Sequence, residues 1–145
     1  MLLSFLVYER GVYTFWSQKG VERLNAEDAI SLIEIEEPVI IDVRSEEEYQ
    51  VSHMDEAKRY SPEIIEKLNP NDPILVYCTA SVRSNSLAKV LVNLGFTHIY
   101  ELKGGLLHWK NQGYPLVRTD GNRTDSLHTY SSTLAPFLRK GTAVY

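Results

Sequence analysis

The sequence has little cysteine: Cys78 is the only one among 145 residues. A disulfide within the chain needs two cysteines and a cysteine-based zinc cluster needs several, so both kinds of scaffold are excluded. His98 and His108 have no metal-ligating companions at suitable spacing, and we expect neither a metal nor an organic cofactor. A hydrophobic core must therefore stabilise the fold, and a chain of this length with 43% apolar residues can form one.

Long apolar runs and clusters of basic residues are also absent. The longest apolar stretch, residues 1–8, is interrupted by Ser4 and lacks the flanking features of a secretory signal. It is also far shorter than the roughly 20 residues that span a membrane. Residues 21–118 carry 16 acidic and 10 basic residues, which does not suit a phosphate backbone. We therefore expect a cytoplasmic protein that binds neither membranes nor nucleic acid.

Composition divides the chain into three zones. Residues 1–20 are rich in aromatic and aliphatic side chains, and we interpret them as an N-terminal extension that covers a sheet edge or hydrophobic face. Residues 21–118 form the expected domain. Residues 119–145 include eight Ser or Thr residues, which indicates a polar C-terminal tail, mostly extended or partly disordered, with one short helix around residues 132–140. Either end of the chain could instead form a homodimer contact, and a membrane-surface anchor at the first zone is less favoured.

The middle zone alternates apolar runs with segments of helical spacing. The apolar runs predict five strands, at residues 21–24, 38–42, 57–60, 74–77 and 98–102. Capping residues or glycines predict helices that begin at or near Asn25, Ser45, Ser61, Ser84 and Gly104. Because strands alternating with helices form a parallel sheet covered on both faces, we expect a three-layer α/β domain.

Cys78 follows directly after the buried strand at residues 74–77 and precedes the helix at residues 84–94. Ligand sites in parallel α/β sheets lie at the carboxyl ends of strands, and a helix N-terminus offers free N–H groups that favour a thiolate. The intervening residues are small or short, and Arg83 adds a cation. The alternative is a structural cysteine that only packs in the core. We favour a sulfur nucleophile in an anion-binding loop.

The spacing of Cys78 and Arg83 narrows the chemistry. Cysteine-dependent phosphatases place five residues between the cysteine and the arginine, whereas this loop has four: Thr79, Ala80, Ser81 and Val82. The shorter loop predicts a tighter cradle, which suits a target smaller than a phosphoryl group, such as sulfur delivered onto sulfur.

Further motifs occur in a fixed order around this loop. They are Val39-Ile40-Ile41-Asp42-Val43-Arg44, Glu48-Tyr49, Ser52-His53-Met54, Cys78 with Arg83-Ser84, Leu94-Gly95-Phe96, and Gly104-Gly105 with Trp109. In this order residues 21–118 resemble a single-domain rhodanese, or sulfurtransferase. The resemblance implies five mainly parallel strands flanked by helices. It also implies a catalytic cysteine, Cys78, that carries a sulfane sulfur as a persulfide within a loop of residues 78–83.

The expected reaction moves a sulfane sulfur from thiosulfate, or from a small-molecule or protein persulfide, to a thiol or cyanide. Thr79, Ala80, Ser81, Val82 and Arg83 would bind the persulfide, while Asp42, Arg44 and Ser84 would support the site. For Asp42 and Arg44 a structural ion pair is favoured over a position in the site. Two other hypotheses stay open: a cysteine-dependent phosphatase or arsenate reductase on a related fold, and a catalytically weak binding or regulatory module.

Two segments depart from the family pattern. Ser81 stands where the family usually has glycine, and residues 52–56 lack the two glycines and the proline of the usual turn. If the backbone at Ser81 has a positive φ, serine is strained by about 1 kcal/mol relative to glycine. We therefore expect the change Ser81→Gly to stabilise the fold, unless the loop follows a different path.

Overall fold

A five-stranded parallel sheet forms the centre of the protein, of which the computed structural model describes residues 20–145. The sheet order is β1-β5-β4-β2-β3, and every neighbouring pair is parallel. The strands are β1 (Val21–Leu24), β2 (Val39–Asp42), β3 (Lys58–Arg59), β4 (Ile74–Tyr77) and β5 (Ile99–Leu102). The expected fold class is thereby confirmed. The expected N-terminal extension, except for Gly20, lies outside the described residues.

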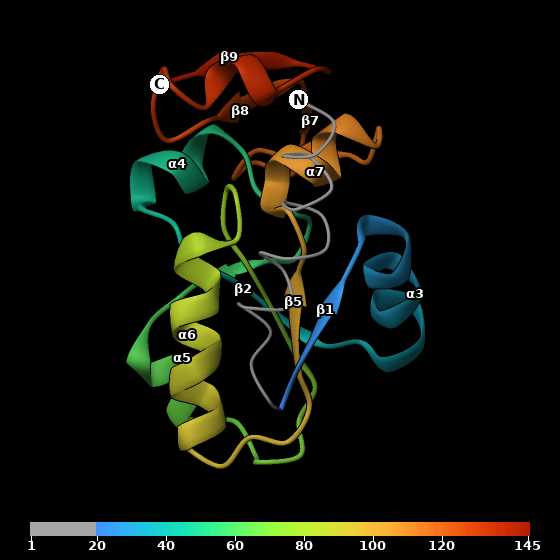
Figure 1. Cartoon of the computed structure of the whole chain (residues 1–145), viewed down its shortest axis with the longest axis vertical. Coiled ribbons are helices and arrows are strands. Elements are labelled where there is room, and N and C mark those ends of the chain that lie inside the picture. The colour runs from blue at the N-terminus through green and yellow to red at the C-terminus, as the bar shows by residue number, and fades with distance from the viewer. Residues whose placement is uncertain (1–19) are drawn as a thin grey trace, which may run out of the picture.

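Helices cover both faces of the sheet (Figure 1). One face carries α3 (Ala26–Glu36) and α7 (Gly105–Asn111), and the other carries α5 (Pro62–Glu66) and α6 (Val82–Asn93). The short α4 (Glu46–Val51) lies near the carboxyl ends of the strands. Because β4 is central, all four of its residues are buried, as its continuous apolar sequence predicts.

Side-chain oxygens cap two of the helices as the sequence predicts. The Asn25 side chain accepts a hydrogen bond from the backbone N–H of Asp28 at the start of α3. At the start of α4, Ser45 and Glu48 form a capping box, in which each side chain binds the backbone of the other residue. Such caps satisfy N–H groups that have no partner within a helix. The capping box also fixes the position of Glu48, which becomes important at the site.

The core consists of one apolar cluster on each face of the sheet. The first cluster joins α3 and α7 to the sheet, and its fully buried members are Ala29, Leu75, Tyr77, Leu102, Leu106, Leu116 and Leu127. The second joins α5 and α6 to the opposite face through Ile41, Ile74, Val76, Ala88 and Leu91. Leu127 belongs to the C-terminal zone, so the first cluster extends beyond the expected boundary at residue 118.

The C-terminal segment, residues 119–145, is folded onto the rest of the protein. Strand β6 (Leu116–Val117) pairs with β7 (Arg123–Thr124), and β8 (Ser126–His128) pairs with β9 (Thr142–Val144). The segment lies beside α4 and α7 at the carboxyl end of the sheet (Figure 1).

This arrangement differs from the expected extended or partly disordered tail. Leu127 is fully buried, and Leu134 and Leu138 pack against the same core cluster, which gives the polar segment enough apolar contact to fold. The short helix expected around residues 132–140 is a single 3-10 turn, Ala135–Phe137.

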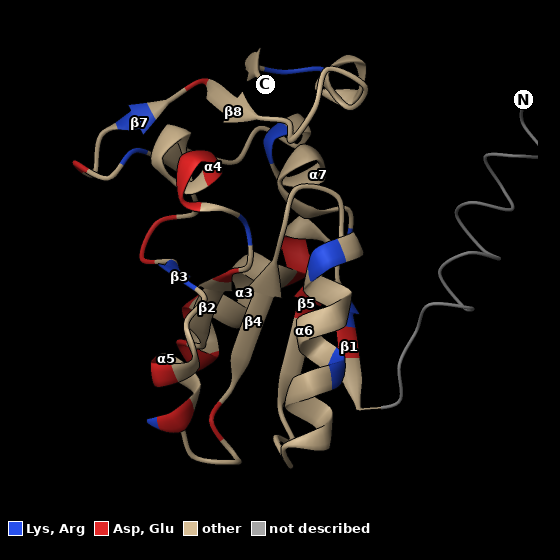
Figure 2. Ribbon diagram, turned by 90° about the vertical axis from the view of Figure 1, so that its left-hand side faces the viewer, with Lys and Arg blue, Asp and Glu red and all other residues tan. Residues whose placement is uncertain are grey.

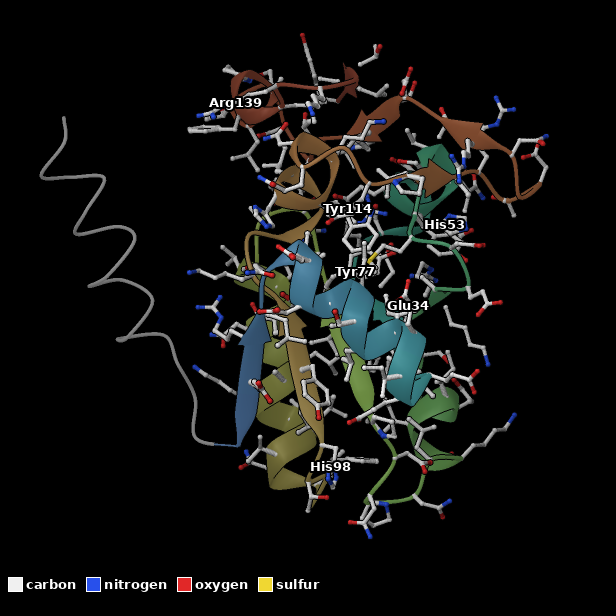
Figure 3. All side chains as sticks on the ribbon, turned by 90° about the vertical axis from the view of Figure 1, so that its right-hand side faces the viewer. Glu34, His53, Tyr77, His98, Tyr114 and Arg139 are labelled. Atoms are coloured by element: carbon white, nitrogen blue, oxygen red, sulfur yellow. The ribbon has the colours of Figure 1, made fainter. Side chains whose placement is uncertain are left out.

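Two kinds of feature are absent from residues 20–145. No helix there is long and apolar enough to cross a membrane. In the same residues, no three His, Cys, Asp or Glu side chains gather as ligands for a metal ion. His98 lies at the opposite end of the sheet from His53 (Figure 3), so these two imidazoles do not share a site.

Candidate active site around Cys78

Cys78 lies at the carboxyl end of the central strand β4, where the sequence places it. The residue is 1% exposed, and its Sγ atom is 3.5 Å from the hydroxyl oxygen of Ser84 in the first turn of α6. Thr79 and Ser81 are also buried. The structure therefore brings the cysteine, the loop and the N-terminus of a 12-residue helix together at one point.

The start of helix α7 packs against the backbone of the cysteine loop. The backbone N–H groups of Leu106 and Leu107 donate to the carbonyl oxygens of Cys78 and Thr79, at 2.9 and 3.2 Å. A β-carbon on Gly105 would lie 2.5 Å from both carbonyl oxygens, closer than any real contact. Glycine is therefore required at position 105, because the start of α7 touches the backbone of the cysteine loop.

Ser81 adopts the left-handed conformation, with φ of 73°. This confirms the expected positive φ and excludes the alternative loop path. Its hydroxyl donates to the carbonyl oxygen of Leu102 at 3.2 Å and accepts from the N–H of Gly104 at 2.8 Å. The serine thus ties the loop to the β5–α7 connection, so replacing it with glycine would relieve strain but also remove two hydrogen bonds.

Arg83 contacts its own loop and two segments that are far from it in sequence. Its Nη1 and Nη2 atoms donate to the two carboxylate oxygens of Glu48, at 2.7 and 2.8 Å. Nη2 also donates to the Thr79 hydroxyl at 3.1 Å, and the Tyr130 ring lies 4.8 Å from the guanidinium carbon. The positive charge beside the loop is therefore compensated by α4 and covered on one side by the C-terminal segment.

The Glu48 carboxylate is almost completely buried. Burial by itself would raise the pKa of Glu48, but hydrogen bonds from Arg83 and Ser45 lower it to about 2. The same hydrogen bond raises the pKa of Arg83. Both partners are thus charged across the ordinary pH range, and the pair is an ion pair rather than a neutral contact.

A second buried acid, Glu101, lies on the far side of the loop. Burial raises the pKa of Glu101, although the charge of Arg23 and the hydrogen bond from Arg23 act in the opposite direction. Arg23 Nη2 is 2.9 Å from a Glu101 carboxylate oxygen. This ion pair joins β1 to β5 at the edge of the sheet.

Asp42 and Arg44 form a separate network under the turn at residues 52–54. Arg44 binds both Asp42 oxygens at 2.7 to 3.2 Å and the carbonyl oxygen of Ser52 at 2.6 Å. Tyr77 donates to Asp42 at 2.6 Å and accepts from the N–H of Met54 at 3.1 Å. Tyr77 lies in the interior of the protein (Figure 3). The structural ion pair favoured from the sequence is what the structure contains.

His53 also has a structural environment. Its Nδ1 atom is 2.9 Å from the carbonyl oxygen of Tyr49, and its ring stacks on the Tyr49 ring with centroids 3.8 Å apart. Its backbone bridges to Val117 in both directions. The histidine therefore joins α4 to β6.

Three residues near the loop were not expected there from the sequence. Glu48 was visible as the last residue of the capping box Ser45–Glu48 and in the Glu48-Tyr49 motif, Glu101 as part of a strand, and Tyr130 as part of a polar tail. Glu48 offered a weak signal, because a capping-box acid at the carboxyl end of the sheet faces the same edge as the loop. No sequence pattern indicated Tyr130, since its position depends on how the C-terminal segment folds back.

A family model of the rhodanese-like domain matches residues 25–112, which is more than half of the sequence. The chain belongs to the rhodanese-like domain family. The matched residues include every strand from β2 to β5 and the whole cysteine loop, while the C-terminal segment lies outside them. The family resemblance seen in the sequence is thereby confirmed.

Relatives of this rhodanese-like protein include enzymes named for sulfur transfer. Thiosulfate sulfurtransferase GlpE of Coxiella burnetii is 37% identical over 87 residues, which cover 57% of this chain and 81% of that protein. Among solved structures, the rhodanese-like domain of an Anabaena protein is 29% identical with a TM-score of 0.61, and the match covers 70% of this chain and 83% of that one. The polysulfide-sulfur transferase homodimer of Wolinella succinogenes is 28% identical with a TM-score of 0.60, covering 77% and 93%.

Proposed function

We propose that this protein is a sulfurtransferase that carries a sulfane sulfur on Cys78. The observation that supports this most strongly is the placement of the cysteine, at the end of β4 and against the N-terminus of α6. There the helix dipole and the free N–H groups of the first turn favour a thiolate and then a persulfide anion. The names of the relatives support the same class of reaction.

The reaction proceeds in two steps. In the first, the Cys78 thiolate attacks the outer sulfur of the donor, a new S–S bond forms, and the donor's own S–S bond breaks. The electron pair leaves with the remainder of the donor, as sulfite from thiosulfate or as a thiolate from a persulfide. In the second, a thiolate or cyanide attacks the outer sulfur, and the Cys78 thiolate is released again. No metal or organic cofactor takes part in either step.

The loop residues have separate roles in this proposal. The backbone from Thr79 to Arg83 surrounds the persulfide, with Ser81 supplying the turn and Ser84 a hydroxyl beside the sulfur. Arg83 joins the loop to α4. Asp42 and Arg44 support the loop indirectly, by holding the end of β2 against Tyr77 in β4.

Steady-state kinetics test the proposal. Initial rates with thiosulfate or glutathione persulfide as donor and cyanide or a thiol as acceptor should give the parallel double-reciprocal lines of a ping-pong reaction. The Cys78→Ser variant should have no activity above the uncatalysed rate, since the chain contains no other cysteine. Transfer at the wild-type rate by Cys78→Ser would reject the mechanism.

Phosphate-ester hydrolysis is the chemical alternative for a cysteine in such a loop. The four-residue spacing to Arg83 and the nearly complete burial of the thiol both favour a smaller target. An assay with p-nitrophenyl phosphate should therefore show no hydrolysis by a preparation that transfers sulfur.

We propose further that the protein acts in the cytoplasm, where a lone thiol stays reduced.

A further inference from the structure

The positive charge of Arg83 in the cysteine loop is already compensated within the protein. Both terminal nitrogens of Arg83 donate to the Glu48 carboxylate, one also donates to Thr79, and the Tyr130 ring covers the guanidinium. If Arg83 turned toward a bound anion, the Glu48 carboxylate would be left buried without its cationic partner. Removing one member of a buried ion pair is strongly unfavourable, so Arg83 stays with Glu48 when a donor binds.

The first turn of α4 adds negative charge around this net-neutral ion pair. Glu46 and Glu47 precede Glu48 in the first turn of α4, and both are exposed. Glu46 forms an ion pair with Arg59 on β3, whereas Glu47 adds a negative charge at the surface. Figure 2 shows this acidic turn at the same end of the molecule as the C-terminal segment. The loop therefore relies on its N–H groups and the α6 dipole to attract an anion.

The two donor classes differ in how much they depend on such a charge. Thiosulfate has two negative charges, and its encounter with the Cys78 thiolate brings three together. At its reacting sulfurs a persulfide has one charge as R–S–S⁻ and none as R–S–SH. The charged groups of glutathione persulfide lie several bonds from these sulfurs, so the encounter at the loop brings together two charges or one. Because Coulomb repulsion grows with the product of the charges, a neutralised loop penalises thiosulfate more than a persulfide.

We propose that Glu48 is a specificity-determining residue, which neutralises Arg83 and so makes a persulfide the preferred donor over thiosulfate. This inference rests on the proposed sulfurtransferase function. For the preferred donor, the Cys78 thiolate attacks the outer sulfur of R–S–SH, the Cys78–sulfur bond forms, and the R–S to sulfur bond breaks. The thiolate R–S⁻ leaves with the electron pair, and the proton stays on the outer sulfur or passes to water.

The test measures how fast Cys78 gains one sulfur from each donor. Intact mass is followed with excess thiosulfate or excess glutathione persulfide, for the wild type, Glu48→Gln and Glu47→Gln. Glutamine preserves the capping box and one hydrogen bond to Arg83, but removes the compensating charge. Glu47→Gln is the matched control, because it removes the same charge one residue away, where the side chain is exposed.

The decisive quantity is the ratio of the thiosulfate rate constant to the persulfide rate constant. In Glu48→Gln this ratio should rise on the order of tenfold, since one extra unit of donor charge then meets an uncompensated guanidinium. In Glu47→Gln it should stay within about twofold of the wild type, because exposed charges are screened. A purely structural role of Glu48 would change both rate constants equally and leave their ratio constant.

A second measurement needs no variant. If the site does not steer a dianion, the wild-type thiosulfate rate constant should be flat or rise as potassium chloride is increased from about 20 to 300 mM. A steep fall with salt, or an unchanged donor ratio in Glu48→Gln while both donors still load Cys78, overturns the specificity inference and leaves sulfur transfer intact. Failure of both donors to add sulfur to the wild type rejects the proposed function itself.

Discussion

Two neighbouring regions of the protein each contain a carboxylate paired with an arginine, and they differ in connection and in exposure. Asp42 and Arg44 are two residues apart, and both side chains are fully inaccessible. Glu48 and Arg83 are 35 residues apart and join α4 to the cysteine loop, with the Arg83 side chain 33% exposed. The first pair therefore belongs to the folded framework, whereas the second can alter the electrostatics of the loop while the framework stays in place.

Removing the carboxylate charge of the Asp42–Arg44 pair should have the largest effect on stability. The change Asp42→Asn leaves Arg44 charged and buried without its carboxylate, so we expect a loss of about 3–5 kcal/mol in the free energy of unfolding. Glu48→Gln should cost less, because the Arg83 side chain can reach water. Urea unfolding of both variants measures the difference, and a smaller loss in Asp42→Asn than in Glu48→Gln would contradict this ranking.

The Glu48–Arg83 pair should make the stability of the protein depend on pH in the acidic range. Because the pKa of Glu48 is lowered from 4.5 to about 2, its contribution is fully present above pH 4.5 and is lost as the pH falls through 2. The shift corresponds to on the order of 3 kcal/mol. The stability difference between wild type and Glu48→Gln should therefore shrink between pH 5 and pH 2. Comparing the two proteins cancels other acids, such as Glu101, and a difference independent of pH would contradict the assigned ion pair.

The framework around the Asp42–Arg44 pair was largely predictable from the sequence, and the surroundings of the Glu48–Arg83 pair were not. Apolar runs, caps and the glycine pair are local signals, so the strands, most helix starts and the position of Cys78 followed from them. Helix α6 begins at Val82, two residues before the expected Ser84. The Asp42–Arg44 pair was also local. The partner of Arg83 depends on a contact across 35 residues, and the position of Tyr130 on a C-terminal segment whose folding rests on a few leucines. Neither leaves a periodic pattern.

Substitutions of Ser81 measure how strongly its hydrogen bonds stabilise the loop beside the Glu48–Arg83 pair. Both Ser81→Ala and Ser81→Gly lose the hydrogen bonds to Leu102 and Gly104, at a cost of about 1–2 kcal/mol. Glycine also relieves the strain of a positive φ, so Ser81→Gly should be the more stable of the two by about 1 kcal/mol. Thermal unfolding in parallel decides the order. A Ser81→Gly variant more stable than the wild type would show that strain outweighs both hydrogen bonds.

Substitution of Tyr130, which covers one side of the Glu48–Arg83 pair, should have the smallest effect on stability. Its ring lies over the Arg83 guanidinium and is itself 61% exposed, so Tyr130→Ala should reduce stability by only about 0.5–1 kcal/mol. The Tyr130→Phe control keeps the ring and should match the wild type. A loss above about 2 kcal/mol in Tyr130→Ala would mean that this contact, rather than the buried Leu127, anchors the C-terminal segment.

The claim on which the whole comparison depends is that Cys78 carries the transferred sulfur. Intact mass of the reduced protein after incubation with a sulfane-sulfur donor, here glutathione persulfide, tests it directly. We expect the mass to rise by one sulfur atom, to return to its starting value when a thiol acceptor is added, and not to change in Cys78→Ser. No gain of sulfur by the folded wild-type protein, or the same gain in Cys78→Ser, would contradict the account.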